Sequence, residues 1–377
     1  MTRSEETAGT EPSVVRRYAP VIAALLVSRL VIGATALLVE GGAVPLNPLL
    51  AFGDGAPILR SLTSWDGSWF TAIARDGYHL AGYGPLNYHD YAFFPLYPMF
   101  VRVLALPWPH LVGLIAVGLN VLLYPSLLVL LVRLARRHIG EPRAIRAAAL
   151  YALFPFSYVY SMAYSETLTL TLILAAFLLI ERGHVVRAGA FYGLASLARA
   201  QSAFYFLPLL FASRLAKPGR WRLLAVGLGP LATLSYLVWV AWFTGSPNGY
   251  FATYAAWGRN TGGAAAGLGS VGDEFSGPLA WYFAILMVCL VFAVALFVFV
   301  RVDRIPPAYV AIPVISLVML FVTGSLEAIG RVVLLSFPYS WILASRQHPA
   351  WRYGWPAISV ALLAIFSTLT FAGWWNP

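Results

Sequence analysis

The stretch from Trp65 to Pro98 gathers side chains that could do chemistry. In the helix that we expect over residues 65–77, Asp66 lies beside apolar neighbours. A carboxylate in such surroundings can accept a proton from a substrate hydroxyl, which is the role of a general base. The alternative is that Asp66, like Ser64, caps the N-terminus of that helix.

Further along this stretch, His79, His89 and Asp90 are candidates for binding rather than catalysis. Their spacing matches no compact ligand pattern such as two histidines one helical turn apart, so we predict no metal site. A divalent ion is possible, but no cofactor is required. The alternative is that these residues are solvated polar groups at a membrane interface.

Two arginines and one glutamate outside this stretch could hold an anion. Arg199 lies in an apolar region, and at the centre of a bilayer an arginine costs about 2.5–3.5 kcal/mol. It could bind a phosphate or form a structural ion pair with Glu166. Arg331 could bind the same anion or extend to the membrane surface. Glu166 could take part in catalysis or complement the start of a helix.

The composition places these residues in a membrane. Of 377 residues, 60% are hydrophobic and 11% are charged, so one water-soluble core cannot bury the apolar surface. The net charge of +10 comes from short basic clusters between apolar runs, which argues against nucleic-acid binding. The single cysteine, Cys289, excludes a disulfide framework.

We therefore expect an all-α polytopic protein with one membrane domain over residues 1–377. Its first helix, 19–39, is expected to be an uncleaved span. Nine apolar runs have approximately the length of a full span. They are residues 19–39, 111–132, 144–160, 163–180, 223–243, 279–300, 308–323, 332–345 and 355–373.

Residues 188–213 allow two topologies, because basic clusters flank them on both sides. A single crossing would put one cluster outside the cell. We favour a re-entrant pair of half-helices that meet near Ala198-Arg199-Ala200-Gln201 and return the chain to its starting side.

The resulting topology has a cytoplasmic N-terminus and leaves eighteen of the 25 basic residues inside. Nine of the 15 acidic residues then lie outside or at the outer surface, where polar chemistry could occur. Two outer loops are long, residues 40–110 as an active-site loop with an amphipathic interfacial helix, and residues 244–278 as a possible lid. Arginine greatly outnumbers lysine, which is typical of a G+C-rich genome. We therefore expect a bacterial inner membrane.

The order of several motifs resembles the PIG-V family, the GPI mannosyltransferase 2-like enzymes that add the second mannose in GPI-anchor assembly, and its bacterial relatives. The motifs are Trp65-Asp66-Gly67, Ile73-Ala74-Arg75-Asp76-Gly77-Tyr78, Ala92-Phe93-Phe94-Pro95-Leu96-Tyr97-Pro98, Ala163-Tyr164-Ser165-Glu166, Ala198-Arg199, and Arg331 ahead of Phe337-Pro338.

This resemblance implies a GT-C glycosyltransferase fold with an active site at the outer surface. It implies transfer of mannose, with inversion, from a polyprenyl-phosphate-linked donor to a lipid or glycolipid acceptor. Asp66 occupies the position of the family's catalytic aspartate, and Arg199 and Arg331 are candidates for the donor phosphate. The other candidates for substrate binding are Arg75, Tyr78, His79, His89, Asp90 and Glu166.

Two rival functions do not involve sugar transfer. A lipid or anionic-substrate transporter or flippase would use Arg199 and the broken span as an anion site near the middle of the membrane. A catalytically silent relative could instead scaffold other membrane enzymes. This sequence lacks the internal inverted repeat that is typical of such transporters.

Overall fold

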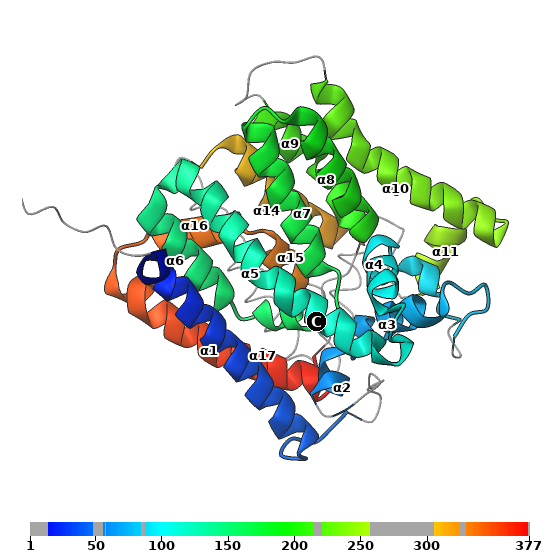
Figure 1. Ribbon diagram of the computed structural model, residues 1–377, viewed down its shortest axis with the longest axis horizontal. Coiled ribbons are helices and arrows are strands. Elements are labelled where there is room, and N and C mark those ends of the chain that lie inside the picture. Colours follow the sequence, from blue (N-terminus) through cyan, green and yellow to red (C-terminus); the bar gives the residue numbers. More distant parts are fainter. Residues whose placement is uncertain are drawn as a thin grey trace, which may run out of the picture.

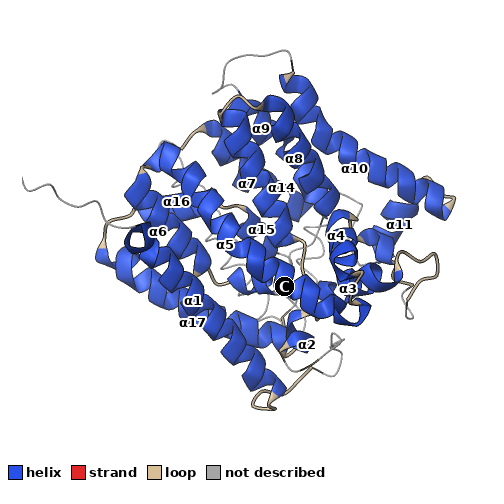
Figure 2. Cartoon of the chain, viewed as in Figure 1, coloured by secondary structure: helices blue, strands red, loops and turns tan. Residues whose placement is uncertain are grey.

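Helices make up nearly all of the described chain, as Figure 2 shows. The structure is a computed structural model that describes residues 14–47, 56, 58–83, 87–213, 221–256, 305–323 and 329–375. Within these ranges no strand forms, and the only bridge pairs Tyr83 with Tyr88. The expected span 279–300 and residues 257–278 of the expected lid lie outside the described residues.

Four described helices are long and apolar enough to cross a membrane, namely Val15–Glu40, Pro109–Ile139, Leu223–Thr244 and Ala350–Phe371. The first half of the chain contains α1 (Val14–Glu40), α2 (Leu59–Leu62), α3 (Asp66–Asp76), α4 (Leu96–Ala105), α5 (Val112–Ile139), α6 (Glu141–Ala152) and α7 (Glu166–Glu181). The second half contains α8 (Val185–Ala198), α9 (Phe206–Ser213), α10 (Arg222–Thr244), α11 (Gly249–Ala256), α14 (Pro307–Thr323), α15 (Ile329–Leu335), α16 (Pro338–Ser345) and α17 (Trp355–Phe371). Short 3-10 or π segments are η1 (Asp90–Ala92), η2 (Pro109–Leu111), η3 (Ser157–Ser161), η4 (Ala200–Tyr205) and η6 (Ala350–Gly354).

The expected count of nine full spans is not confirmed, and two of the expected spans are each divided. The run 144–160 ends as an α-helix at Ala152, ahead of Pro155, and continues as η3. The run 332–345 breaks between α15 and α16, where Pro338 cannot donate to the carbonyl of Leu334. The hydroxyl of Tyr151 donates to that carbonyl instead.

Residues 185–213 form a hairpin that turns near Arg199, where the two expected half-helices were to meet, but α8 extends along the whole of α7, because Arg199 at its end contacts Glu166 at the start of α7. Helix α8 ends at Arg199, whose backbone is extended (φ −159°), and η4 and α9 lead back. Gly189 lies against Ala225, and Gly193 lies against Leu228, so α8 and α10 run in the same direction. Both helices therefore start on the same side of the bundle (Figure 1).

The bundle has two chemically different ends. At the basic end, Arg17 pairs with Glu141 at 3.3 Å, and Arg146 Nη1 donates to the carbonyl of Arg346 at 2.8 Å. These contacts join the start of α1, the start of α6 and the chain after α16. At the opposite end, the loop end, the indole of Trp65 donates to the carbonyl of Thr370 at 3.0 Å. Figure 1 shows α1 and α17 side by side between these ends.

Helix α3 was expected to lie flat, with a stripe of Trp65, Trp69, Ala72 and Ile73 in the headgroup layer. It forms over nearly the expected residues, and of that stripe Ile73 is buried by protein, as are Phe70 and Ala74 beside it. The ring of Phe70 packs 5.2 Å from that of Tyr97 of α4. Trp65 and Trp69 are half-buried. The packed face fixes α3 on the bundle, and with it the position of Asp66.

Candidate active site

Four charged side chains, distant in the sequence, meet at the loop end. Arg199 Nη1 lies 2.7 Å from Glu166 Oε1, and Arg331 Nη1 lies 3.6 Å from the same oxygen. Arg331 Nη1 also contacts Asp66 Oδ2. Positive and negative groups thus alternate from Arg199 through Glu166 and Arg331 to Asp66, and we call this set the four-charge chain.

The backbone before Asp66 has an unusual conformation. Trp65 adopts a positive φ of 56°, which costs a residue with a β-carbon about 1–3 kcal/mol and is found where tertiary contacts impose it. Those contacts include the indole bond to Thr370. Asp66 lies in the first turn of α3, where a carboxylate complements the helix N-terminus, and its side chain also pairs with Arg331.

Glu166 is positioned by the turn that precedes it. It is the first residue of α7 and is completely buried. The amide of Asn120, buried in α5, donates to the carbonyls of Met162 and, at 2.8 Å, Tyr164. The backbone of Ala163 donates to the carbonyl of Leu62 at 2.8 Å, which ties this turn to the segment before α3.

Asn120 was not among the sequence-based candidates. The signal that could have identified it is a single amide within the apolar run 111–132, because a polar side chain in a membrane helix usually has a specific partner. Its partners are two carbonyls and the hydroxyl of Tyr97. These contacts connect α5 and α4 to the turn that carries Glu166.

The two arginines differ in their surroundings. Arg331 is 3% exposed, and its guanidinium lies 5.6 Å from the ring centre of Tyr164. The preceding residue is Gly330, where a β-carbon would come within 2.7 Å of the Phe156 ring. Arg199 was expected near the middle of the membrane, but it lies level with the first residue of α7, because α8 continues to the loop end.

Access to the four-charge chain is uneven. The side chain of Glu166 is 0% exposed and that of Arg331 is 4%, whereas those of Arg199 and Asp66 are 19% and 23% exposed. Removing a charge from water is costly unless an opposite charge compensates for it, as it does at each step here. The arrangement therefore presents an oriented, accessible carboxylate and an accessible guanidinium, joined by two groups that solvent scarcely reaches.

His79 and Asp90 form a separate cluster in the first long loop. Both the backbone N–H of His79 (2.9 Å) and its Nδ1 (3.1 Å) lie within hydrogen-bond distance of Asp90 Oδ2. Burial raises the pKa of the Asp90 carboxyl, although the contacts with His79 act in the opposite direction. Tyr78 donates to the carbonyl of Phe93 at 2.8 Å. These contacts hold the loop together.

The remaining candidates lie apart from the four-charge chain. Arg75 is exposed and pairs with Asp76 at 3.1 Å, and His89 stacks 4.7 Å from the ring of Tyr91. Within the described residues, no hydrogen bond or ion pair joins His79, His89 or Asp90 to Glu166, Arg199 or Arg331.

A metal centre has no obvious ligand set in the part of the chain that the structure describes. Those ranges hold no group of three or more histidines, cysteines and carboxylates that could bind an ion. Four carboxylates expected on the outer side, Asp54, Asp273, Glu274 and Glu327, lie outside the described residues.

Known proteins resemble this chain in both sequence and fold. The family model described as mannosyltransferase (PIG-V) matches residues 25–210. GPI mannosyltransferase 2 of Drosophila pseudoobscura pseudoobscura is 34% identical over 119 residues, which are 29% of this chain and 25% of that protein. The match thus spans about a quarter of the relative's length.

Two solved structures share the fold. ArnT from Cupriavidus metallidurans, bound to undecaprenyl phosphate, matches with a TM-score of 0.53 and 16% identity over 93% of this chain and 76% of its own. The Archaeoglobus fulgidus oligosaccharyltransferase, tethered to an acceptor peptide, matches with a TM-score of 0.51 and 12% identity over 97% of this chain and 56% of its own.

The chain is therefore a multi-pass membrane protein with a GT-C fold. In sequence, residues 25–210, just under half of the chain, resemble the PIG-V mannosyltransferase family. The matched residues include Asp66, Glu166 and Arg199, while Arg331 lies beyond them.

Proposed function

We propose that this protein is a membrane glycosyltransferase that moves mannose from a polyprenyl-phosphate-linked donor to a hydroxyl group of a lipid or glycolipid. The observation that carries the proposal is the contact between Arg331 and Asp66, which orients an accessible carboxylate at the loop end. The PIG-V match supports mannose as the sugar. ArnT, which shares the fold, binds undecaprenyl phosphate, and this supports a polyprenyl phosphate carrier.

The reaction is a single displacement at the sugar carbon. The acceptor oxygen forms a bond to this carbon as the bond to the donor phosphate breaks, so the configuration inverts. Asp66 takes the proton of the acceptor hydroxyl, a contribution typically worth about 10² to 10⁴ in rate. The electron pair of the broken bond leaves with the phosphate, and a cation already in place stabilises it.

Arg199 fits the role of phosphate ligand better than Arg331. Its side chain is 19% exposed and lies at a break between helices, where a lipid phosphate can approach. The Arg331 side chain is 4% exposed and already contacts both carboxylates. We assign Arg331 the role of holding Asp66 in place, and Glu166 the role of holding both arginines.

The orientation follows from the two ends of the bundle. Basic residues collect at the end where α1, α6, α8 and α10 begin, and such residues favour the cytoplasmic side. We therefore place the four-charge chain on the outer face of a bacterial plasma membrane. There, the mannosyl lipid enters laterally, with its sugar at the surface.

The test uses the purified full chain in lipid nanodiscs, with radiolabelled polyprenyl-phosphate mannose and a lipid extract as acceptor. We expect a mannosylated lipid from the wild type and a fall of about 10² to 10⁴ in rate for Asp66→Asn. The matched control is Asp76→Asn, which removes an exposed carboxylate at the other end of α3.

Two outcomes contradict the proposal: no product from the wild type, or full activity in Asp66→Asn. A transporter gives a different pattern. Its lipid flipping would survive Asp66→Asn but fail in Arg199→Ala, with no labelled product in either case.

A further inference from the structure

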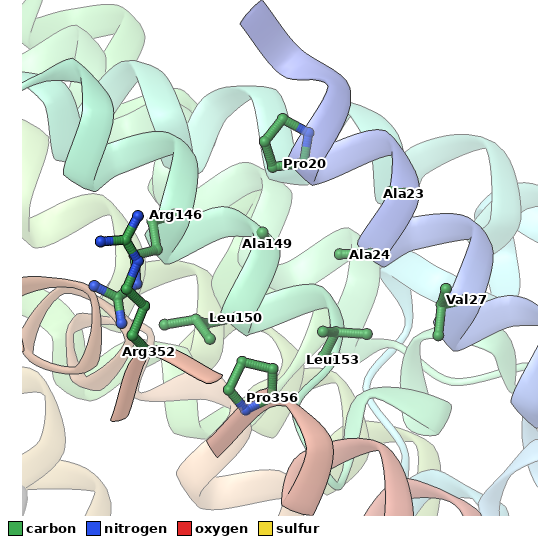
Figure 3. Close-up of a pocket in the computed structure, with 10 residues that line it drawn as sticks. All are labelled: Pro20, Ala23, Ala24, Val27, Arg146, Ala149, Leu150, Leu153, Arg352 and Pro356. Atoms are coloured by element: carbon green, nitrogen blue, oxygen red, sulfur yellow. The ribbon is translucent and has the colours of Figure 1, made fainter. Parts of the chain in front are cut away.

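A groove opens at the basic end, far along the helices from the four-charge chain. Figure 3 shows it between α1, α6 and the start of α17. Its volume is about 310 Å³. One wall is a stripe of α1 from Pro20 to Val27, and the facing wall is a stripe of α6 and its C-cap, from Arg146 to Leu153. Each stripe has the i, i+3, i+4, i+7 spacing of a single helix face.

The walls are apolar along most of their length. Ala24 and Ala149 are small, which leaves the space between the helices, and Leu150 and Leu153 line its depth. Both stripes run inward from the basic end. A seven-residue step along a helix covers about 10 Å, or roughly one-third of the hydrocarbon core of a bilayer. A narrow apolar groove of this length suits one acyl chain.

The mouth of the groove is positively charged. Arg146 and Arg352 both line it, and Figure 3 shows the two guanidinium groups close together. Arg146 donates to three carbonyls, those of Ala344, Arg346 and Trp351. Arg352 is exposed and lies over the ring of Tyr353 at 5.4 Å. Among the described residues, neither arginine forms an ion pair with a carboxylate.

We propose that this groove binds an anionic phospholipid, with the phosphate between Arg146 and Arg352 and one acyl chain between α1 and α6. Two neighbouring guanidinium groups repel each other, and an anion offsets that repulsion. A net negative headgroup suits the pair better than a zwitterionic one, whose own ammonium group cancels the charge. Basic pockets between membrane helices on the cytoplasmic side are suited to such headgroups.

The experiment measures lipid retention on the purified full chain by native mass spectrometry, after release from nanodiscs of phosphatidylglycerol and phosphatidylcholine in equal amounts. We expect the wild type to retain phosphatidylglycerol preferentially. Arg352→Gln should weaken this retention about fivefold, the weight of one basic residue near an anionic surface. The matched control is Arg143→Gln, an exposed arginine of α6 outside the groove.

A second variant tests the apolar part of the site. Ala24→Phe fills the groove while both arginines remain, and it should lower retention of phosphatidylglycerol as well. Equal retention of the two lipids, or wild-type retention in Arg352→Gln, would overturn the proposal. Glycerol 3-phosphate should not compete; if it does so at lipid-like concentrations, the site binds a free phosphate and the lipid assignment is wrong. Mannosyl transfer is not part of the readout, so the proposed function is tested separately.

Discussion

Helix α7 has a buried glutamate at each end, and the surroundings of the two glutamates differ. At the loop end, Glu166 contacts Arg199 and Arg331 through the same oxygen. At the basic end, the side chain of Glu181 is 3% exposed. It lies 2.8 Å from both Arg137 Nε and His138 Nε2, and it accepts a hydrogen bond from Tyr309.

The helix dipole explains part of this difference. The amide groups at the start of α7 favour a carboxylate, whereas the carbonyl groups at its end oppose one. Glu181 therefore needs three surrounding groups, which lie on α5 and α14 and fasten these helices to α7. Glu166 instead shares Arg331 with a second carboxylate, Asp66, whose side chain is 23% exposed. An accessible carboxylate, that of Asp66, distinguishes the proposed active-site cluster from the cluster around Glu181.

The largest difference in stability and in transfer rate is expected between Glu166→Gln and Glu181→Gln. Removing Glu166 leaves Arg199 and the buried Arg331 short of a counter-charge, and breaking a buried pair costs about 3–5 kcal/mol of unfolding free energy. Transfer should be lost as well. Glu181→Gln should cost less, about 1–3 kcal/mol, because Arg137 reaches solvent and a neutral amide can still bond to Tyr309.

Thermal unfolding in detergent and the transfer rate per folded molecule measure these effects. If Glu181→Gln abolished transfer in folded protein, or if Glu166→Gln changed neither quantity, the assignment of the two clusters would be wrong.

Next in size is the effect of Arg199 on donor binding. A hydrogen bond to a charged group contributes about 1.5–3 kcal/mol, so Arg199→Gln should raise the donor KM by about 10- to 100-fold. Arg199→Lys, which keeps the charge, should recover part of the lost affinity for the donor. Arg187→Gln, at the exposed start of α8, is the matched control. An unchanged donor KM with reduced stability would show that Arg199 serves only in the ion pair.

A smaller effect is expected from Asn120, which positions the turn before Glu166. Asn120→Ala leaves the buried carbonyls of Met162 and Tyr164 without their donor, at a cost of about 1–3 kcal/mol. The value of kcat should fall and the donor KM should rise, because a shift of this turn moves Glu166, which holds both Arg331 and Arg199. Ser235→Ala, at an exposed hydroxyl of α10, provides the comparison. A loss of stability with normal kcat would contradict the positioning role.

The smallest effect is expected from Asp90, in the cluster apart from the four-charge chain. Because burial raises its pKa, the protonated form stabilises the fold at pH values below the unfolded-state pKa of about 3.9. This contribution is lost as the pH rises through the raised folded-state pKa. Asp90→Asn imitates the protonated form, so its melting temperature should slightly exceed that of the wild type at neutral pH. The difference should narrow towards pH 4, and a reversed sign would contradict this account.

Local sequence signals predicted part of this structure well. The helix containing Asp66 was expected over residues 65–77, and it forms at Asp66–Asp76. The break at Arg199 was expected because basic clusters flank both sides of the hairpin. The two divided runs were not expected, although Pro155 and Pro338 are visible in the sequence. Hydrophobicity alone does not show whether a neighbouring side chain can donate a hydrogen bond to the carbonyl that a helix break leaves without a donor. Tyr151 does so for Leu334.

The sequence by itself determined that this protein is a helical membrane protein with its basic residues at one end, because hydrophobicity and charge follow from composition and order alone. It also identified Asp66, Glu166, Arg199 and Arg331 as the charges of interest. Only the tertiary structure decided that these four form one alternating chain, with Arg331 on Asp66 and Glu166 between the arginines. Their partners lie on separate helices, and which charges meet depends on how α3, α7, α8 and α15 pack.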